Sequence, residues 1–142
     1  PGGRALGVRA DAGTVFWAVV EMVDDKLVVV GREDMTLPQS FGDPQAFAWV
    51  RDKIQALIRE FAVNIAGVRT PEGMAQGRGE GTRRRLRIEG VVMEAASAMG
   101  LQVHCGALAT IASGLDLESA KSAKEYQDKG GCLRGLDLNT LG

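Results

Sequence analysis

The stretch ALGVRADAGTVFWAVVE, from Ala5 to Glu21, decides the fold because it reads as two strands joined by a tight turn. Ala5 to Arg9 is short and largely apolar, and Thr14 to Met22 is rich in the β-branched and aromatic residues that favour strands. The turn from Asp24 to Lys26 leads into LVVVGRE, a nearly continuous apolar run. The sequence therefore predicts an antiparallel meander of three strands, with the middle and last strands buried.

A helix with a clear start follows this meander. Asp43 fits the N-cap position, and Pro44 fits the first helical position. The apolar residues after them recur with the 3.6-residue period of a helix that buries one face: Phe47, Val50, Ile54, Leu57, Ile58 and Phe61. Trp49 lies off this stripe, so it is either partly buried under a neighbouring loop or an anchor for a protein partner.

The rest of the chain alternates between strands and helices. Ala62 to Arg69 predicts a strand, and a glycine-rich loop follows it. Thr82 to Met99 predicts a second helix that ends at Gly100, and LQVHC predicts another short strand. The face of the second helix expected to be buried is Ile88, Val91, Val92, Ala95 and Met99. Weaker helix patterns come afterwards, so the predicted order is β-β-β-α-β-α-β-α, an α/β fold with a mixed five-stranded sheet and helices on both faces.

Length and composition indicate a single globular domain from residue 1 to residue 142, although the pattern is weak from 115 to 142. The formal net charge of −1 gives no overall attraction to nucleic acid, so any basic surface must be local. No apolar run approaches the roughly 18 residues that a membrane span needs. Cys105 and Cys132 lack the spacing of metal ligands and are interpreted as reduced thiols of a cytoplasmic protein.

The order of elements resembles the ribonuclease-H-like fold, and two stretches are similar to RuvC-type Holliday-junction resolvases and the related pre-16S ribosomal RNA nucleases. ALGVRADAGTVFWAVVE resembles their opening strand-turn-strand, which runs glycine, aliphatic residue, aspartate, small residue, glycine. RLRIEGVVMEAASAMGLQVHCGALATIASGL resembles the helix-strand-helix that follows their fourth strand. The resemblance covers roughly Arg4 to Leu115. It implies a ribonuclease-H-like domain that acts on or binds nucleic acid.

The resemblance also implies where a metal site would lie. The family holds two Mg²⁺ ions, about 3.5–4 Å apart, between carboxylates on the first strand, at the end of the fourth strand and on the last helix. An ungapped alignment puts Arg9 at the first position, whereas a shorter turn would put Asp11 there. Glu72 lies just beyond the fourth strand, and Asp137 could stand in for the last-helix aspartate, with Arg134 one turn before it.

Two interpretations of these carboxylates are open. Arginine cannot replace an oxygen ligand of Mg²⁺, so we expect no tight paired-metal site and no cofactor, with the three acids serving in turns or caps. If the chain is an active nuclease, Asp11, Glu72 and Asp137 would be its catalytic residues and its Mg²⁺ ligands. His104, the only histidine, lies in a predicted strand without partners at zinc spacing, so a structural role competes with a catalytic one.

Arginines gather around the start of the second predicted helix. The group is Arg78, Arg83, Arg84, Arg85 and Arg87. Positive charge at a helix N-terminus opposes the helix dipole, whereas guanidinium groups and free backbone N–H groups together suit a phosphate. These arginines therefore either bind the backbone of branched or duplex DNA, or of RNA, or form salt bridges to Glu72, Glu80 and Glu89.

Three classes of function fit these patterns. The first is a ribonuclease-H-like module with a degenerate metal site, which binds nucleic acid or assembles with a protein partner or a second copy of the chain. The second is an active Mg²⁺-dependent, structure-specific endonuclease. The third comes from DAGT, Asp11 to Thr14, which resembles the first phosphate loop of the sugar-kinase and actin superfamily, although 142 residues leave no room for its second domain. The sequence favours the first class.

Overall fold

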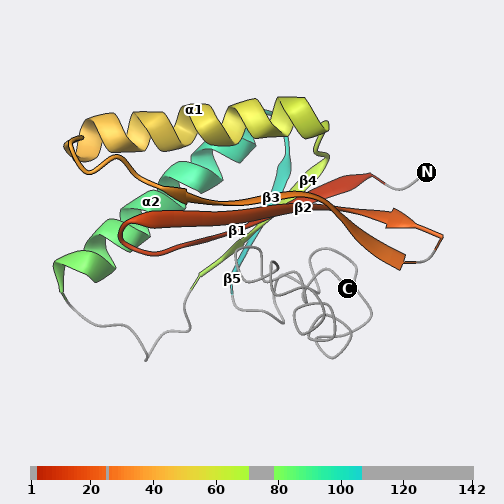
Figure 1. The fold of residues 1–142 in the computed structure, drawn as a ribbon, viewed down its shortest axis with the longest axis horizontal. Helices are drawn as coiled ribbons and strands as arrows, with labels where there is room; N and C mark the ends of the chain where they lie inside the picture. The colour runs from red at the N-terminus through yellow and green to blue at the C-terminus, as the bar shows by residue number, and fades with distance from the viewer. Residues whose placement is uncertain (1–2, 25, 71–78, 107–142) are drawn as a thin grey trace.

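Five strands form one sheet in the order β3-β2-β1-β4-β5, and two helices pack against it (Figure 1). The computed structural model describes residues 3–24, 26–70 and 79–106. Its elements are, in chain order, β1 (Arg4–Ala10), β2 (Thr14–Val23), β3 (Lys26–Thr36), α1 (Asp43–Phe61), β4 (Ile65–Arg69), α2 (Glu80–Ala98) and β5 (Gln102–Gly106). This is the predicted order as far as β5, and the helices predicted after it lie outside the described residues.

The predicted antiparallel meander is confirmed, and the parallel strands of the mixed sheet lie on the other side of β1. β1 is antiparallel to β2 and parallel to β4, with Ala5 beside Ile65 and Val8 beside Val68. β5 lies beyond β4 and is also parallel to it. Parallel neighbours need a long crossover, which α2 supplies between β4 and β5. The carboxyl ends of β1, β4 and β5 therefore lie at the same edge of the sheet.

The core lies between one face of the sheet and both helices (Figure 1). Leu6, Val8 and Ala10 of β1 are buried beneath the helices, and strand alternation turns Arg9 to the opposite face. The helices bury Ala46, Val50, Ile54, Leu57, Ile58, Ile88, Glu89, Val92, Ala95 and Ala96. The predicted helical faces are thus largely confirmed, although the outermost members of each stripe are only partly buried: Phe47, Phe61, Val91 and Met99.

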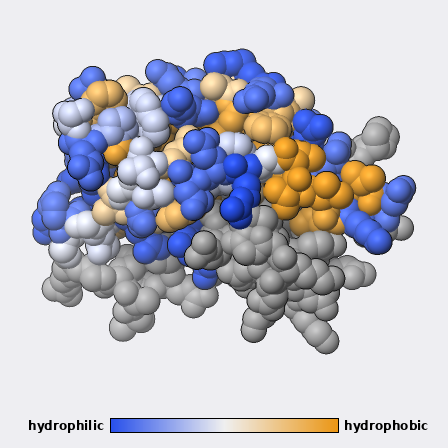
Figure 2. All heavy atoms as spheres, in the orientation of Figure 1, coloured by the Kyte–Doolittle hydropathy of each residue, from blue (hydrophilic) through white to orange (hydrophobic). Residues whose placement is uncertain are grey.

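The last strand of the meander is not buried, which corrects the expectation for LVVVGRE. β3 lies at the edge of the sheet, and most of its residues are exposed. An edge strand has a neighbour on one side only, so an apolar run does not require burial of both its faces. Figure 2 shows apolar surface at the end of the β2–β3 hairpin, where Met22, Val23, Val28 and Val29 are exposed. We call these four residues the hairpin patch; Met22 and Val29 lie on one face of the hairpin, and Val23 and Val28 on the other.

The helix α1 begins one residue earlier than predicted, and this leaves Asp43 free to bind Arg84. Gly42 is the N-cap, and Asp43 and Pro44 are the first two helical residues. The Asp43 carboxylate makes no capping hydrogen bond and instead accepts one from Arg84 of α2. The prediction of Asp43 as the N-cap is therefore wrong, because a partner distant in sequence binds the carboxylate.

The ends of α2 lie close to the predicted ones. The helix begins at Glu80, two residues before the predicted start. Gly100 has φ +85°, and the N–H of Leu101 returns to the carbonyl oxygen of Ala96 at 3.2 Å. This left-handed residue confirms the predicted stop. Neither helix of the described part is long and apolar enough to cross a membrane.

Candidate nucleic-acid interface

Arg9 lies near the carboxyl end of β1, where the ungapped resemblance would place the first metal-binding aspartate. It faces away from the helices, because its neighbours Val8 and Ala10 point into the core. Its guanidinium carbon lies 5.0 Å from the ring centroid of Phe16, which is its cross-strand neighbour on β2. A cation over an aromatic face is attracted to it, so Phe16 helps to hold the guanidinium on this face.

Arg69 ends β4 and lies on the same face as Arg9. Val8 and Val68 are register partners, so the two arginines that follow them lie side by side on adjacent parallel strands, about 4.8 Å apart at the backbone. The family resemblance directs attention to acids at the end of the fourth strand, so the sequence alone does not single out Arg69. The alternation along this strand, in which Ala66 and Val68 face the core, combined with parallel pairing to β1, is the pattern that could have placed Arg69 beside Arg9.

Asp11, the other candidate for the first carboxylate, organises the turn between β1 and β2. Its Oδ1 accepts hydrogen bonds from the N–H groups of Gly13, at 2.9 Å, and Thr14, at 2.8 Å. The Asp11 N–H donates to the carbonyl oxygen of Thr14 at 3.0 Å. These bonds give Asp11 the turn role that short acidic side chains often have.

The described residues at this edge of the sheet do not fit a paired magnesium centre. The side chains at the ends of β1 and β4 where such a centre would lie are those of Arg9 and Arg69, and both are cations. No group of three His, Cys, Asp or Glu residues that could hold a metal is present within 3–24, 26–70 and 79–106. Glu72, Asp137 and Arg78 lie outside the described residues. The set of three carboxylates therefore stays a prediction.

Arg84 joins three elements at the start of α2. Its Nε donates to Asp43 Oδ1 at 3.0 Å, and its Nη1 donates to the carbonyl oxygen of Ala12 at 2.7 Å. Only 25% of its side chain is exposed. Arg84 thus connects α2 to the first turn of α1 and to the β1–β2 turn. It forms a salt bridge, as one of the two interpretations expected, but its partner is Asp43 and not one of the three glutamates named there.

Arg83 and Arg87 are the exposed members of the arginine group. Their side chains are 62% and 51% exposed, and they lie 3.3 Å and 3.5 Å from carboxylate oxygens of Glu80, which is itself 73% exposed. Arg87 also lies 3.7 Å from Asp43. Exposed ion pairs contribute little net free energy, so a phosphate can compete with Glu80 for both guanidinium groups.

Arg85 pairs with an acid that the sequence did not mark as buried. Its Nε lies 3.3 Å from Glu89 Oε2, and the Glu89 side chain is only 2% exposed. Burial raises the pKa of the Glu89 carboxyl group, and the bond to Arg85 offsets part of this effect. Burial, with a smaller contribution from Glu89, also raises the pKa of the Cys105 thiol on β5, which favours an unreactive thiol.

We expect the stability of the protein to depend on pH through Glu89. A carboxyl group whose pKa is higher in the folded than in the unfolded chain binds its proton more tightly when folded. The free energy of unfolding should therefore fall as pH rises from about 4.5, the ordinary value, through the raised pKa. Urea unfolding at several pH values measures it, and Glu89→Gln should remove this fall.

Glu94 provides a control of opposite sign. The hydrogen bond from Arg51, 2.7 Å long, lowers the pKa of the Glu94 carboxyl group, so its contribution to stability is lost as pH falls through the lowered value. Glu94→Gln should remove a fall in the free energy of unfolding that occurs as the pH is lowered. Glu89→Gln should instead remove a fall in the free energy of unfolding that occurs as the pH rises toward neutral. Identical pH profiles for Glu89→Gln and the unchanged protein would contradict the assignment.

The surroundings of His104 and Trp49 bear on the roles predicted for these two residues. His104 lies on β5, beside Gly67 of β4, and its Nε2 atom is buried without a hydrogen-bond partner in the described part of the chain. Trp49 is partly buried against the core, with the Lys53 ammonium 5.6 Å from its ring centroid. Its position agrees with partial burial, and its role as a partner anchor stays untested.

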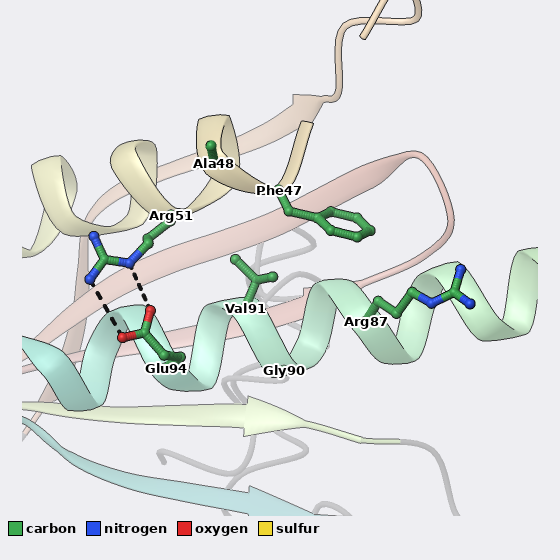
Figure 3. Close-up of a pocket in the computed structure, with 7 residues that line it drawn as sticks. All are labelled: Phe47, Ala48, Arg51, Arg87, Gly90, Val91 and Glu94. Carbon is green, nitrogen blue, oxygen red and sulfur yellow. Dashed lines mark hydrogen bonds and ion pairs between the residues drawn. The ribbon is translucent and has the colours of Figure 1, made fainter. Parts of the chain in front are cut away.

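A shallow groove runs between α1 and α2 (Figure 3). Its lining is Phe47, Ala48, Arg51, Arg87, Gly90, Val91 and Glu94. Figure 3 shows the ion pair of Arg51 with Glu94 near one end and Arg87 near the other. The groove is thus apolar in the middle and charged at its ends, and Arg87 belongs both to it and to the arginine group.

Solved structures with a similar arrangement include Holliday-junction resolvases. RuvC of T. thermophilus in complex with a Holliday junction superimposes with a TM-score of 0.70 at 13% identity, covering 97% of this chain and 90% of that one. A second Thermus thermophilus RuvC structure gives 0.70 at 12% identity, covering 96% and 91%. The yeast mitochondrial resolvase Ydc2 gives 0.57 at 14% identity, covering 93% of this chain and 63% of that one.

These likenesses show the fold. The chain has the ribonuclease-H-like fold in its RuvC-type form, as its sequence predicts. The sugar-kinase and actin alternative is not favoured by these neighbours. No protein-family model matches the chain, and no curated protein matches it in sequence.

Proposed function

We propose that this domain binds the sugar-phosphate backbone of branched or duplex nucleic acid. The observation that carries the proposal is the pair of exposed guanidinium groups, Arg83 and Arg87, at the N-terminus of α2. Arg84 holds this helix start against the β1–β2 turn, so both groups lie near the edge where β1 and β4 end. The RuvC structure whose fold matches is bound to a Holliday junction, which supports a nucleic acid as the ligand.

We propose further that the module has no paired magnesium site and needs no cofactor. Arg9 and Arg69 on the two central strands support this, because a guanidinium repels a divalent cation and offers it no lone pair. The alternative is an active Mg²⁺-dependent endonuclease. That enzyme would need Asp11, Glu72 and Asp137 to converge despite the two nearby arginines.

Titration of a fluorescent four-way junction and a matched duplex at low salt tests the proposal. We expect weak, sequence-independent binding that falls steeply with salt, because each neutralised phosphate releases condensed counterions. The double variant Arg83→Gln/Arg87→Gln should bind at least about tenfold more weakly, with a salt slope smaller by about two. Lys53→Gln/Arg59→Gln on α1 is the control, since it removes the same charge from the helix surface.

The same titration with Mg²⁺ separates the two classes of function. Intact DNA after long incubation supports the binding module. Cleavage that Asp11→Asn abolishes would establish the nuclease instead. No binding of the unchanged protein at low salt would refute the proposal.

Protein assembly is a second candidate function, favoured by the hairpin patch. Its four apolar side chains are between 37% and 46% exposed, two on each face of the β2–β3 hairpin end. Exposed apolar surface often marks a contact with another protein. An analytical ultracentrifugation series over protein concentration would detect self-association, and Val28→Lys should abolish it.

A further inference from the structure

The carboxyl ends of β1 and β4 carry two arginines on one face of the sheet. Arg9 and Arg69 each follow a residue of a register pair, Val8 and Val68, and both strands run in the same direction. Alternation gives both side chains the same face, opposite the helices. Both residues are partly buried. Two cations are therefore held side by side by the two central strands.

In the ungapped alignment, Arg9 takes the place of the first metal-binding carboxylate of the resembled nucleases, and Arg69 ends the strand after which they hold another. That pattern has one carboxylate on the first strand and one at the end of the fourth, and this chain has Arg9 near the end of β1 and Arg69 at the end of β4. A two-metal centre puts positive charge between these strands and the scissile phosphate. In this chain the positive charge is carried by the strand residues Arg9 and Arg69.

We propose that Arg9 and Arg69 form a charge-inverted centre that binds a backbone phosphate directly, without a metal ion. This inference rests on the proposed function and assigns the ligand contact within it. A guanidinium offers paired N–H donors that match two oxygens of one phosphate, and partial burial strengthens the attraction.

Two contacts fix the centre relative to the rest of the molecule. Phe16 holds the Arg9 guanidinium from β2. Arg84 binds the carbonyl oxygen of Ala12, three residues after Arg9, and so joins the start of α2 to this edge of the sheet. The strand arginines and the start of α2 thus lie toward the same end of the sheet, on its two opposite faces.

Neither Arg9 nor Arg69 is without a partner within the protein. A phosphate would join or displace those contacts, as it would displace Glu80 from Arg83. The centre therefore differs from a metal site in a measurable way. Its affinity for nucleic acid should not depend on divalent cations.

The test compares the double variant Arg9→Gln/Arg69→Gln with the unchanged protein on the same duplex and junction, in EDTA and in Mg²⁺. We expect equal binding of the unchanged protein in EDTA and in Mg²⁺ at matched ionic strength. The double variant should lose at least about tenfold in affinity and about two in salt slope. The control is Arg59→Gln/Lys53→Gln, which should bind like the unchanged protein.

The outcomes separate this inference from the proposed function. If Arg83→Gln/Arg87→Gln weakens binding but Arg9→Gln/Arg69→Gln behaves like the control, the charge-inverted centre is refuted and the module still binds nucleic acid. If the unchanged protein binds only with divalent cations, the centre is refuted in favour of a metal site. If it binds under neither condition, both proposals fail.

A second variant covers the case in which the glutamines prevent folding. Arg9→Lys/Arg69→Lys keeps both charges but loses the paired donors of the guanidinium groups. With its melting temperature retained, it should bind several-fold more weakly while keeping the salt slope. Unchanged affinity of this folded variant would overturn the assignment of the two guanidinium groups.

Discussion

Replacing Ile54 with alanine is expected to lower the free energy of unfolding by about 3 kcal/mol. Ile54 is fully buried in the middle of α1, within the single core cluster between the helices and the sheet. Truncation removes apolar burial and leaves a cavity that the packed sheet beneath α1 cannot close. Urea unfolding followed by far-UV circular dichroism measures the change.

Ile54→Val and Ala48→Ser are the controls for this change in stability. Ile54→Val removes one methylene group and should cost about 1 kcal/mol. Ala48→Ser, at an exposed position of the same helix, should change stability by less than about 0.5 kcal/mol. A cost below about 1 kcal/mol for Ile54→Ala would contradict the placement of this residue in the core.

Replacing Arg84 with alanine is expected to cost about 2 kcal/mol, which is large for a residue at the start of a helix. The side chain makes two hydrogen bonds, one charge-assisted to Asp43 and one to the carbonyl oxygen of Ala12. Its loss frees the start of α2 from the β1–β2 turn. Nucleic-acid binding should weaken as a consequence, because Arg83 and Arg87 depend on the position of this helix start.

Arg83→Ala is the matched control, one residue away on the same helix. Its partner Glu80 is highly exposed, so the change should cost less than about 0.5 kcal/mol. Arg84→Lys should recover part of the stability by keeping the charge near Asp43 while losing the second bond. Equal unfolding midpoints for Arg83→Ala and Arg84→Ala would show that Arg84 is not a structural connector.

The arginine group shows how far residue type alone can predict a site. Four arginines within five positions at a helix start predicted either phosphate binding or salt bridges, and the sequence left both open. The structure separates them by neighbour: Arg84 and Arg85 bind less exposed partners, whereas Arg83 and Arg87 remain mostly in solvent. Exposure and partner depend on which elements meet, and that information is not local in the chain.

The sequence by itself predicted the order of elements as far as β5 and the antiparallel meander, and its resemblance to RuvC-type resolvases predicted the form of the sheet. The order of elements and the meander follow from period and turn residues, which act between near neighbours along the chain. Only the tertiary structure decided that β3 is an exposed edge, that Glu89 is buried, and that Arg9 and Arg69 lie side by side. The physical reason is that burial and charge pairing depend on which elements meet. Arg9 and Arg69 are neighbours only because β1 and β4, about 60 residues apart, pair in register when the sheet forms.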